Sequence, residues 1–194
     1  MGVSLNLAHL WIVGVWVIFF VYWVIAAISA RRGLNRNAFR GGMTLRIGMF
    51  VVILAAVFVT RRSHYLASLQ RAEFDSVPLA VADALVATVG AILAFVARAA
   101  IGRNWGPPAT RRTDTELISA GPYGLIRHPI YSGVLLMMVG TAVGLFPIWW
   151  LVAIASGVYF ILSARSEEKF MTSRFPAEYP AYRARTKMFL PFIF

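Results

Sequence analysis

The sequence predicts an all-α, polytopic membrane protein with about five transmembrane helices. Of its residues 59% are hydrophobic and the mean hydropathy is +0.70. Only 14% are charged, whereas soluble domains average roughly 25%. Apolar runs long enough to cross a bilayer follow one another along the chain. The 194 residues suffice for a single membrane domain, and a chain without cysteine can hold neither a disulfide framework nor a cysteine-based metal site.

The N-terminal half predicts three membrane spans. The first apolar run, residues 7–30, is longer than a hydrocarbon core of roughly 30 Å requires. It is also longer than a signal-peptide core, so we expect it to be retained as a helix. Further spans are predicted at about 44–60 and 77–100.

The C-terminal half predicts a helical hairpin. The apolar stretch 129–163 is too long for one membrane helix, and "LFPIWW" (145–150) contains a proline that breaks it. The sequence therefore predicts spans at 129–145 and 147–163, joined by a tight turn. In the polar tail that follows, a separate helix is expected from Ser166 to about Arg174.

The basic residues predict the orientation of these spans. Segments 31–46, 98–127 and 164–194 carry five, five and six Lys or Arg, whereas 61–76 carries three, beside two acids. The positive-inside rule then places the N-terminus outside and the tail in the cytoplasm. The net charge of +11 suits an anionic lipid surface, and no nucleic-acid-binding motif accompanies it. The Arg- and Ala-rich composition favours a prokaryotic inner membrane.

Polar residues gather where the hairpin begins. Pro129 suits the first turn of a helix, so the stretch "LIRHPIYSG" (125–133) is expected to open a span there. Backbone N–H groups at a helix start attract anions, and Arg127 and His128 add donors to them. The alternative is that this Arg-His pair only satisfies the positive-inside rule. Three scattered histidines predict no metal site.

A second polar cluster, Glu167 and Glu168, follows where the hairpin returns. A carboxylate at a membrane boundary is a candidate functional residue. For Glu167 we favour function. For Glu168 we favour the solvated first turn of the tail helix, where acids are stabilised electrostatically and Ser166 can cap.

These motifs together resemble the isoprenylcysteine carboxyl methyltransferase family, in its prokaryotic form. The similarity lies in "GRNW" (102–105), in "GPY" and "LIRHPIYSG", and in the tail "EEKFMTSRFPAEYPAYRARTKMFLP". It covers roughly residues 102–194. Phospholipid N-methyltransferases and some membrane reductases share this C-terminal region.

The resemblance implies transfer of a methyl group from S-adenosylmethionine (SAM) at the cytoplasmic membrane face. It implies a cofactor pocket formed by loop 101–127 and the tail, with segments 101–128 and 164–194 as its two parts. The implied acceptor is an amphipathic or prenylated molecule with a carboxylate, entering from the membrane lipids. By position, the resemblance assigns the acidic residue near the acceptor to Glu167, and cofactor contacts to Thr115, Glu116, Leu117, Ile118, Tyr123, His128, Pro129, Ile130 and Tyr131.

Two positions depart from the family pattern. Eukaryotic members have His where this chain has Thr115, and the family's acceptor-binding Arg aligns with Ser163. The nearest arginine is Arg165, which we expect to orient an acceptor carboxylate. No general base is required, because a carboxylate is already ionised near neutral pH. The alternatives left open are a lipid N-methyltransferase, an NADPH-dependent membrane reductase and a non-catalytic membrane protein.

Overall fold

A computed structural model describes residues 2–30, 76–105, 116–145 and 147–193 of the chain. The described part is helical and contains no β-strand. The all-α prediction is therefore confirmed for these residues. The predicted span 44–60 lies outside them, so the count of five spans stays a prediction.

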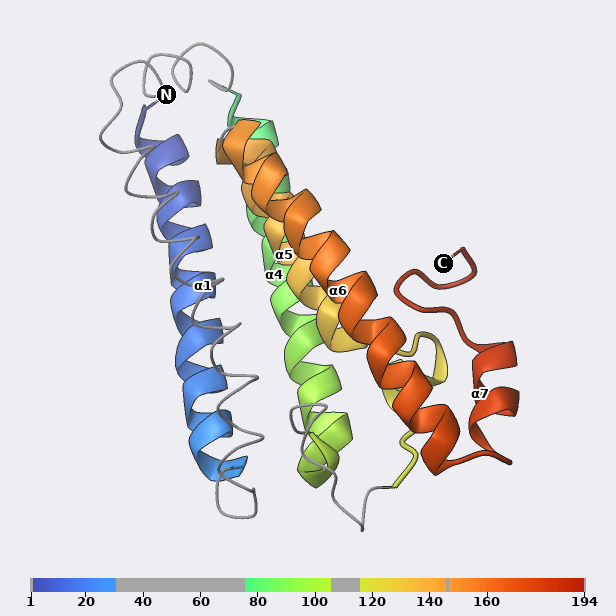
Figure 1. Cartoon of the computed structure of the whole chain (residues 1–194). Helices are drawn as coiled ribbons and strands as arrows, with labels where there is room; N and C mark the ends of the chain where they lie inside the picture. Colours follow the sequence, from blue (N-terminus) through green and yellow to red (C-terminus); the bar gives the residue numbers. More distant parts are fainter. Residues whose placement is uncertain (1, 31–75, 106–115, 146, 194) are drawn as a thin grey trace.

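Helices α1 (Gly2–Ala30), α4 (Val77–Ile101), α5 (Pro129–Leu145) and α6 (Pro147–Arg174) run lengthwise through the molecule (Figure 1). A short helix, α7 (Tyr179–Arg185), lies beside the lower end of α6, and the chain then turns back (Figure 1). Within the described residues α1, α4 and α6 are each long and apolar enough to cross a membrane. The apolar part of α5 is shorter.

Proline and glycine set several helix ends. Pro78 lies in the first turn of α4, and Gly102 follows its last residue with a φ of 52°, which favours glycine. Helix α5 begins at Pro129 and ends at Leu145, and α6 begins at Pro147. The break between α5 and α6 thus falls at the Phe-Pro sequence, where the chain lacks one amide donor.

The separate tail helix expected from Ser166 is wrong, because α6 continues without interruption to Arg174. The physical reason is cooperativity: extending an existing helix adds one hydrogen bond per residue, whereas a new helix needs a costly nucleus. No Gly or Pro interrupts the chain between Gly157 and Pro176. The 28 residues of α6 extend about 42 Å, which is longer than the thickness of a hydrocarbon core, roughly 30 Å.

Helices α4 and α5 pack backbone to backbone through small residues. A Cβ atom built on Gly90 of α4 would lie 2.5 Å from the carbonyl oxygen of Gly133 of α5. One built on Gly140 would lie 2.7 Å from the amide nitrogen of Ala87. Such close approach is typical of membrane helix pairs with small residues at the interface. The buried face of α4 consists of Ala80, Asp83, Ala87, Gly90, Ala91, Ala94 and Ala97.

Aromatic side chains join α1 to this pair. The indole N–H of Trp11 donates to Thr88 Oγ1 at 2.9 Å, and that of Trp16 donates to Thr141 Oγ1 at 3.0 Å. Phe19 is buried and stacks on Trp23 with ring centroids 4.5 Å apart. Polar bonds at both α4 and α5 therefore fix α1 beside them.

Candidate active site

The chain entering α5 is paired with the tail. The amide of Arg127 donates to the carbonyl of Lys187 at 2.8 Å, and that of His128 donates to the carbonyl of Met188 at 3.1 Å. Ile126 and Lys187 form an isolated parallel bridge. The Tyr182 hydroxyl donates to the carbonyl of Tyr123 at 2.8 Å. The segment 123–128 is therefore held in place by residues about sixty positions later in the chain.

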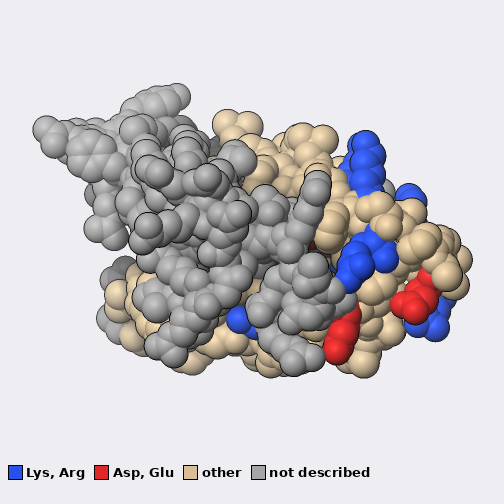
Figure 2. Space-filling model, turned by 60° about the horizontal axis from the view of Figure 1, so that its bottom comes forward, with Lys and Arg blue, Asp and Glu red and all other residues tan. Residues whose placement is uncertain are grey.

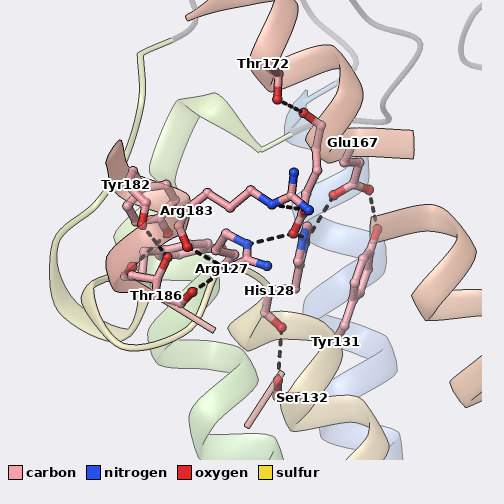
Figure 3. A network of polar contacts seen from close by, with 11 residues as sticks. Arg127, His128, Tyr131, Ser132, Glu167, Thr172, Tyr182, Arg183 and Thr186 are labelled. Atoms are coloured by element: carbon pink, nitrogen blue, oxygen red, sulfur yellow. Dashed lines mark hydrogen bonds and ion pairs between the residues drawn. The ribbon is translucent and has the colours of Figure 1, made fainter. Parts of the chain in front are cut away.

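This pairing bears on the anion site predicted at the start of α5. The amides of Arg127 and His128, just before the helix, are bound by tail carbonyls. Their side chains, moreover, face carboxylates of the protein itself, on α6 (Figure 3). The anion site at the first turn of α5 itself stays a prediction.

Glu168 is buried at the centre of a polar network, which corrects the expectation that it is a solvated surface acid. The Nε of Arg127 donates to its Oε1 at 2.6 Å, and the Nε2 of His128 lies 3.4 Å from the same oxygen. Arg183 of α7 lies 3.5 Å from its Oε2 (Figure 3). One carboxylate therefore joins the start of α5, the end of α6 and the tail. A buried carboxylate requires such partners, because its desolvation is otherwise unfavourable.

Arg127 makes further bonds that fix its guanidinium. Its Nη1 donates to the carbonyl of Thr186 and, at 3.3 Å, to the carbonyl of Arg183. Ser132, one turn into α5, donates from its hydroxyl to the carbonyl of Phe189 at 2.7 Å. The side chains at the start of α5 thus bind the tail backbone at several points, which makes the tail part of the site.

Glu167 lies beside this network and is partly exposed. The hydroxyl of Tyr131 donates to its Oε1, and the Nδ1 of His128 lies 3.5 Å from its Oε2 (Figure 3). The rings of His128 and Tyr131 stack in parallel with centroids 5.6 Å apart. The structure thus brings His128 and Tyr131, at the start of α5, together with Glu167 of α6.

The surroundings of His128 favour its charged form. Burial alone would lower the pKa of its imidazole, but hydrogen bonds and the negative charge of Glu167 and Glu168 outweigh burial and raise that pKa above its usual value. The ring therefore stays protonated to a higher pH than a histidine in water.

We expect this pKa to appear as a pH dependence of stability. A histidine whose pKa is raised by folding stabilises the fold fully below its unfolded value of about 6.5. That contribution is lost as the pH rises through the folded pKa. The difference in melting temperature between the wild type and His128→Asn, followed by tryptophan fluorescence in detergent, should be largest at about pH 6 and shrink in alkaline buffer. A difference that stays constant across this range would contradict the charged imidazole.

The remaining predicted residues are more dispersed. Tyr123 is buried, Pro129 is almost fully buried, and Ile130 is half-buried. Arg165 is exposed on α6. Leu117 and Ile118 are half-buried, and Glu116 is exposed, its amide donating to Asn104 Oδ1 at 3.2 Å. Thr115 lies outside the described residues.

Sequence reasoning missed the central role of Glu168 and the parts of Ser132 and Thr186. One signal was available. Consecutive glutamates on a continuous helix point about 100° apart, so both carboxylates can contact the same site when the helix packs beside it. The contacts of Ser132 with the Phe189 carbonyl and of Arg127 with the Thr186 carbonyl had no such signal, because each joins a side chain to the backbone of a distant residue.

Comparison with known proteins identifies the family to which the chain belongs. Residues 79–178, just over half of the chain, match the model of the phospholipid methyltransferase family. The chain therefore belongs to this family of membrane methyltransferases, and the resemblance to isoprenylcysteine methyltransferases is confirmed at the level of the family.

The individual proteins that the chain resembles include metal-resistance proteins and a probable methyltransferase. The nickel-cobalt-cadmium resistance protein NccN of Alcaligenes xylosoxydans xylosoxydans is 27% identical over 75% of this chain and 64% of its own. The cobalt-zinc-cadmium resistance protein CzcN of Cupriavidus metallidurans is 32% identical over 50% of this chain and 45% of its own. A probable protein-S-isoprenylcysteine O-methyltransferase of Oryza sativa is 40% identical over 40% of this chain and 42% of its own. The matches thus span less than two thirds of these curated relatives.

Proposed function

We propose that the protein is a SAM-dependent methyltransferase that acts at the cytoplasmic membrane face on the carboxylate of an amphipathic, isoprenylcysteine-like acceptor. The observation that carries the proposal is the cluster of His128, Tyr131 and Glu167, in a chain of the phospholipid methyltransferase family. The cytoplasmic orientation rests on the distribution of basic residues.

The residues fit the charges of SAM. Its sulfonium and ammonium groups are positive, and the Glu167 side chain is negative and 26% exposed. Tyr131 and His128 fix the orientation of this carboxylate, so it needs little rearrangement to face a cation. The buried Nε2 of His128 lies 3.4 Å from Glu168 Oε1, so the other side of the ring faces the second carboxylate.

The depth of the cluster suits an amphipathic acceptor. Glu167 lies 20 residues after Pro147, where α6 begins, which corresponds to about 30 Å along the helix. This distance equals the thickness of the hydrocarbon core, roughly 30 Å, so a helix that enters the core at Pro147 would bring the carboxylate to the opposite boundary. The head group of a lipid-like molecule lies at this level while its tail remains among the acyl chains.

The proposed chemistry requires positioning rather than proton transfer. Bound SAM supplies a methyl group activated by its sulfonium. A carboxylate acceptor attacks in its ionised form, so this chain has to align the two molecules and exclude water, which supplies roughly 7–11 kcal/mol in well-aligned reactions. We assign adenine packing to Leu117, Ile118 and Tyr123, and orientation of the acceptor to Arg165.

Calorimetry with SAM tests this proposal. We expect saturable binding to the detergent-solubilised wild type, and loss of roughly tenfold or more in affinity for Glu167→Gln and His128→Ala, because charged hydrogen bonds contribute roughly 1.5–3 kcal/mol. Glu178→Gln is the matched control, because this exposed carboxylate lies in the tail outside the cluster. A wild type that does not bind millimolar SAM would refute the methyltransferase. Variants that all bind like the control would refute only the site.

A second candidate, a phospholipid N-methyltransferase, is favoured by the description of the matched family. The two are separated by pH. An amine must lose its proton to attack, so its methylation should fall steeply in acid. A carboxylate stays ionised down to about pH 4–5. Transfer of radiolabelled methyl to a prenylated cysteine analogue and to phosphatidylethanolamine, each measured over a pH series, distinguishes them.

A further inference from the structure

The tail ends in an exposed apolar segment that the proposed chemistry does not use. Leu190, Phe192 and Ile193 are 53%, 88% and 78% exposed, although Met188 and Phe189 just before them are buried. We call residues 190–193 the apolar tail. Phe192 has a φ of 67°, an unfavourable conformation for a bulky residue. The apolar tail thus exposes large apolar side chains and has a strained backbone at Phe192.

The start of the apolar tail is fixed at the level of the first turn of α5. The Ser132 hydroxyl holds the carbonyl of Phe189 at 2.7 Å. Helix α5 has 17 residues, about 26 Å, which is less than the roughly 30 Å of a hydrocarbon core. If α5 crosses the bilayer, its first turn lies at the boundary of the acyl chains. The apolar tail therefore leaves the protein at this boundary, where exposed apolar side chains are stable in lipid and unstable in water.

Basic residues precede the apolar tail. Arg183, Arg185 and Lys187 are exposed, and Figure 2 shows several Lys and Arg side chains, with acidic ones beside them, on the right of this face. A basic segment next to large apolar residues is the pattern of a sequence that binds anionic membrane surfaces.

We propose that the apolar tail is a membrane anchor: Leu190, Phe192 and Ile193 insert into the interfacial layer, while Arg185 and Lys187 bind anionic lipid head groups. The binding partner of the apolar tail is therefore the phospholipid of the surrounding membrane. The anchor holds the tail carbonyls of Lys187, Met188 and Phe189 against the start of α5. This inference does not depend on methyl transfer and is tested without SAM.

Spin labelling measures the depth directly, because the chain contains no cysteine and Ile193→Cys creates a single attachment point. The matched control is Ala181→Cys, exposed on α7. In phosphatidylcholine vesicles containing phosphatidylglycerol, the label at 193 should collide severalfold more with oxygen than with a water-soluble nickel chelate. The label at 181 should show the reverse. Equal nickel access at both positions overturns the anchor, and protection of 193 from both reagents overturns it in favour of a protein partner.

A second experiment tests whether Arg185 and Lys187 bind anionic lipid head groups. Omitting phosphatidylglycerol should raise nickel access at 193, and the double change Arg185→Gln with Lys187→Gln should raise it equally in vesicles that contain phosphatidylglycerol. Glu178→Gln, which removes a charge of opposite sign from the same tail, should leave the access low. If neither lipid composition nor the double change alters the access, the anionic head-group contact is refuted.

Discussion

Replacement of Glu168 by alanine is expected to destabilise the protein by roughly 3–5 kcal/mol, the usual cost of removing one partner from a buried ion pair. Arg127 would remain desolvated, with only neutral carbonyls as partners. For a chain of this size each kcal/mol lowers the melting temperature by about 2–4 °C, so a fall of roughly 6–20 °C should appear in thermal unfolding followed by tryptophan fluorescence.

The control for this prediction lies in the same network. Arg183 is 3.5 Å from Glu168, but its side chain is 59% exposed. Arg183→Ala should therefore cost no more than about 1 kcal/mol, as exposed pairs usually do. The double variant Arg127→Met with Glu168→Met should be more stable than Glu168→Ala, because it leaves no unpaired buried charge. Equal losses for Glu168→Ala and Arg183→Ala would show that Glu168 is not the centre of the network.

A single methyl group at the α4–α5 contact should also be destabilising. In Gly90→Ala the new Cβ would lie 2.5 Å from Gly133 O and 2.6 Å from the amide of Met137, both backbone atoms. The helices must move apart, which costs roughly 1–3 kcal/mol or more by overpacking. Because Tyr131 lies in the first turn of α5 and His128 directly precedes it, the proposed SAM binding should weaken as well.

The same substitution of glycine by alanine in α1 distinguishes the effect of packing on stability from the effect of helix propensity. At Gly14 of α1 an added Cβ would meet no neighbouring atom within 4 Å among the described residues, so Gly14→Ala should be neutral or stabilising by up to about 1 kcal/mol. The melting temperature should thus fall for Gly90→Ala and stay the same or rise for Gly14→Ala. A stabilised Gly90→Ala would mean that α4 and α5 are not in backbone contact.

Local signals in the sequence predicted much of the helical structure. Pro129 marks the start of α5, and the Phe-Pro break marks the start of α6, because proline restricts the backbone of its own residue. The prediction of a separate helix from Ser166 was wrong, because the change from apolar to polar residues was interpreted as a break in the helix. Polarity ends a membrane span but leaves helix propagation unaffected.

The site was predictable only in part. Placing Tyr131 and Glu167 side by side required the assumption of a hairpin, which the apolar pattern supplies. The contacts of Arg127 with Thr186 and of Ser132 with Phe189 depend on how the tail folds back, and no periodicity encodes this. The distinction between Glu167 and Glu168 also depends on this fold, because the tail supplies partners that surround Glu168.

The pairing of Ile126 with Lys187 has a consequence for biosynthesis. A nascent chain can insert α5 and α6 while Arg127 still lacks the carbonyls of Arg183 and Thr186. The polar network around Glu168 is therefore complete only once the tail has been synthesised and has folded back onto the start of α5. Until then the guanidinium of Arg127 lacks these two carbonyls.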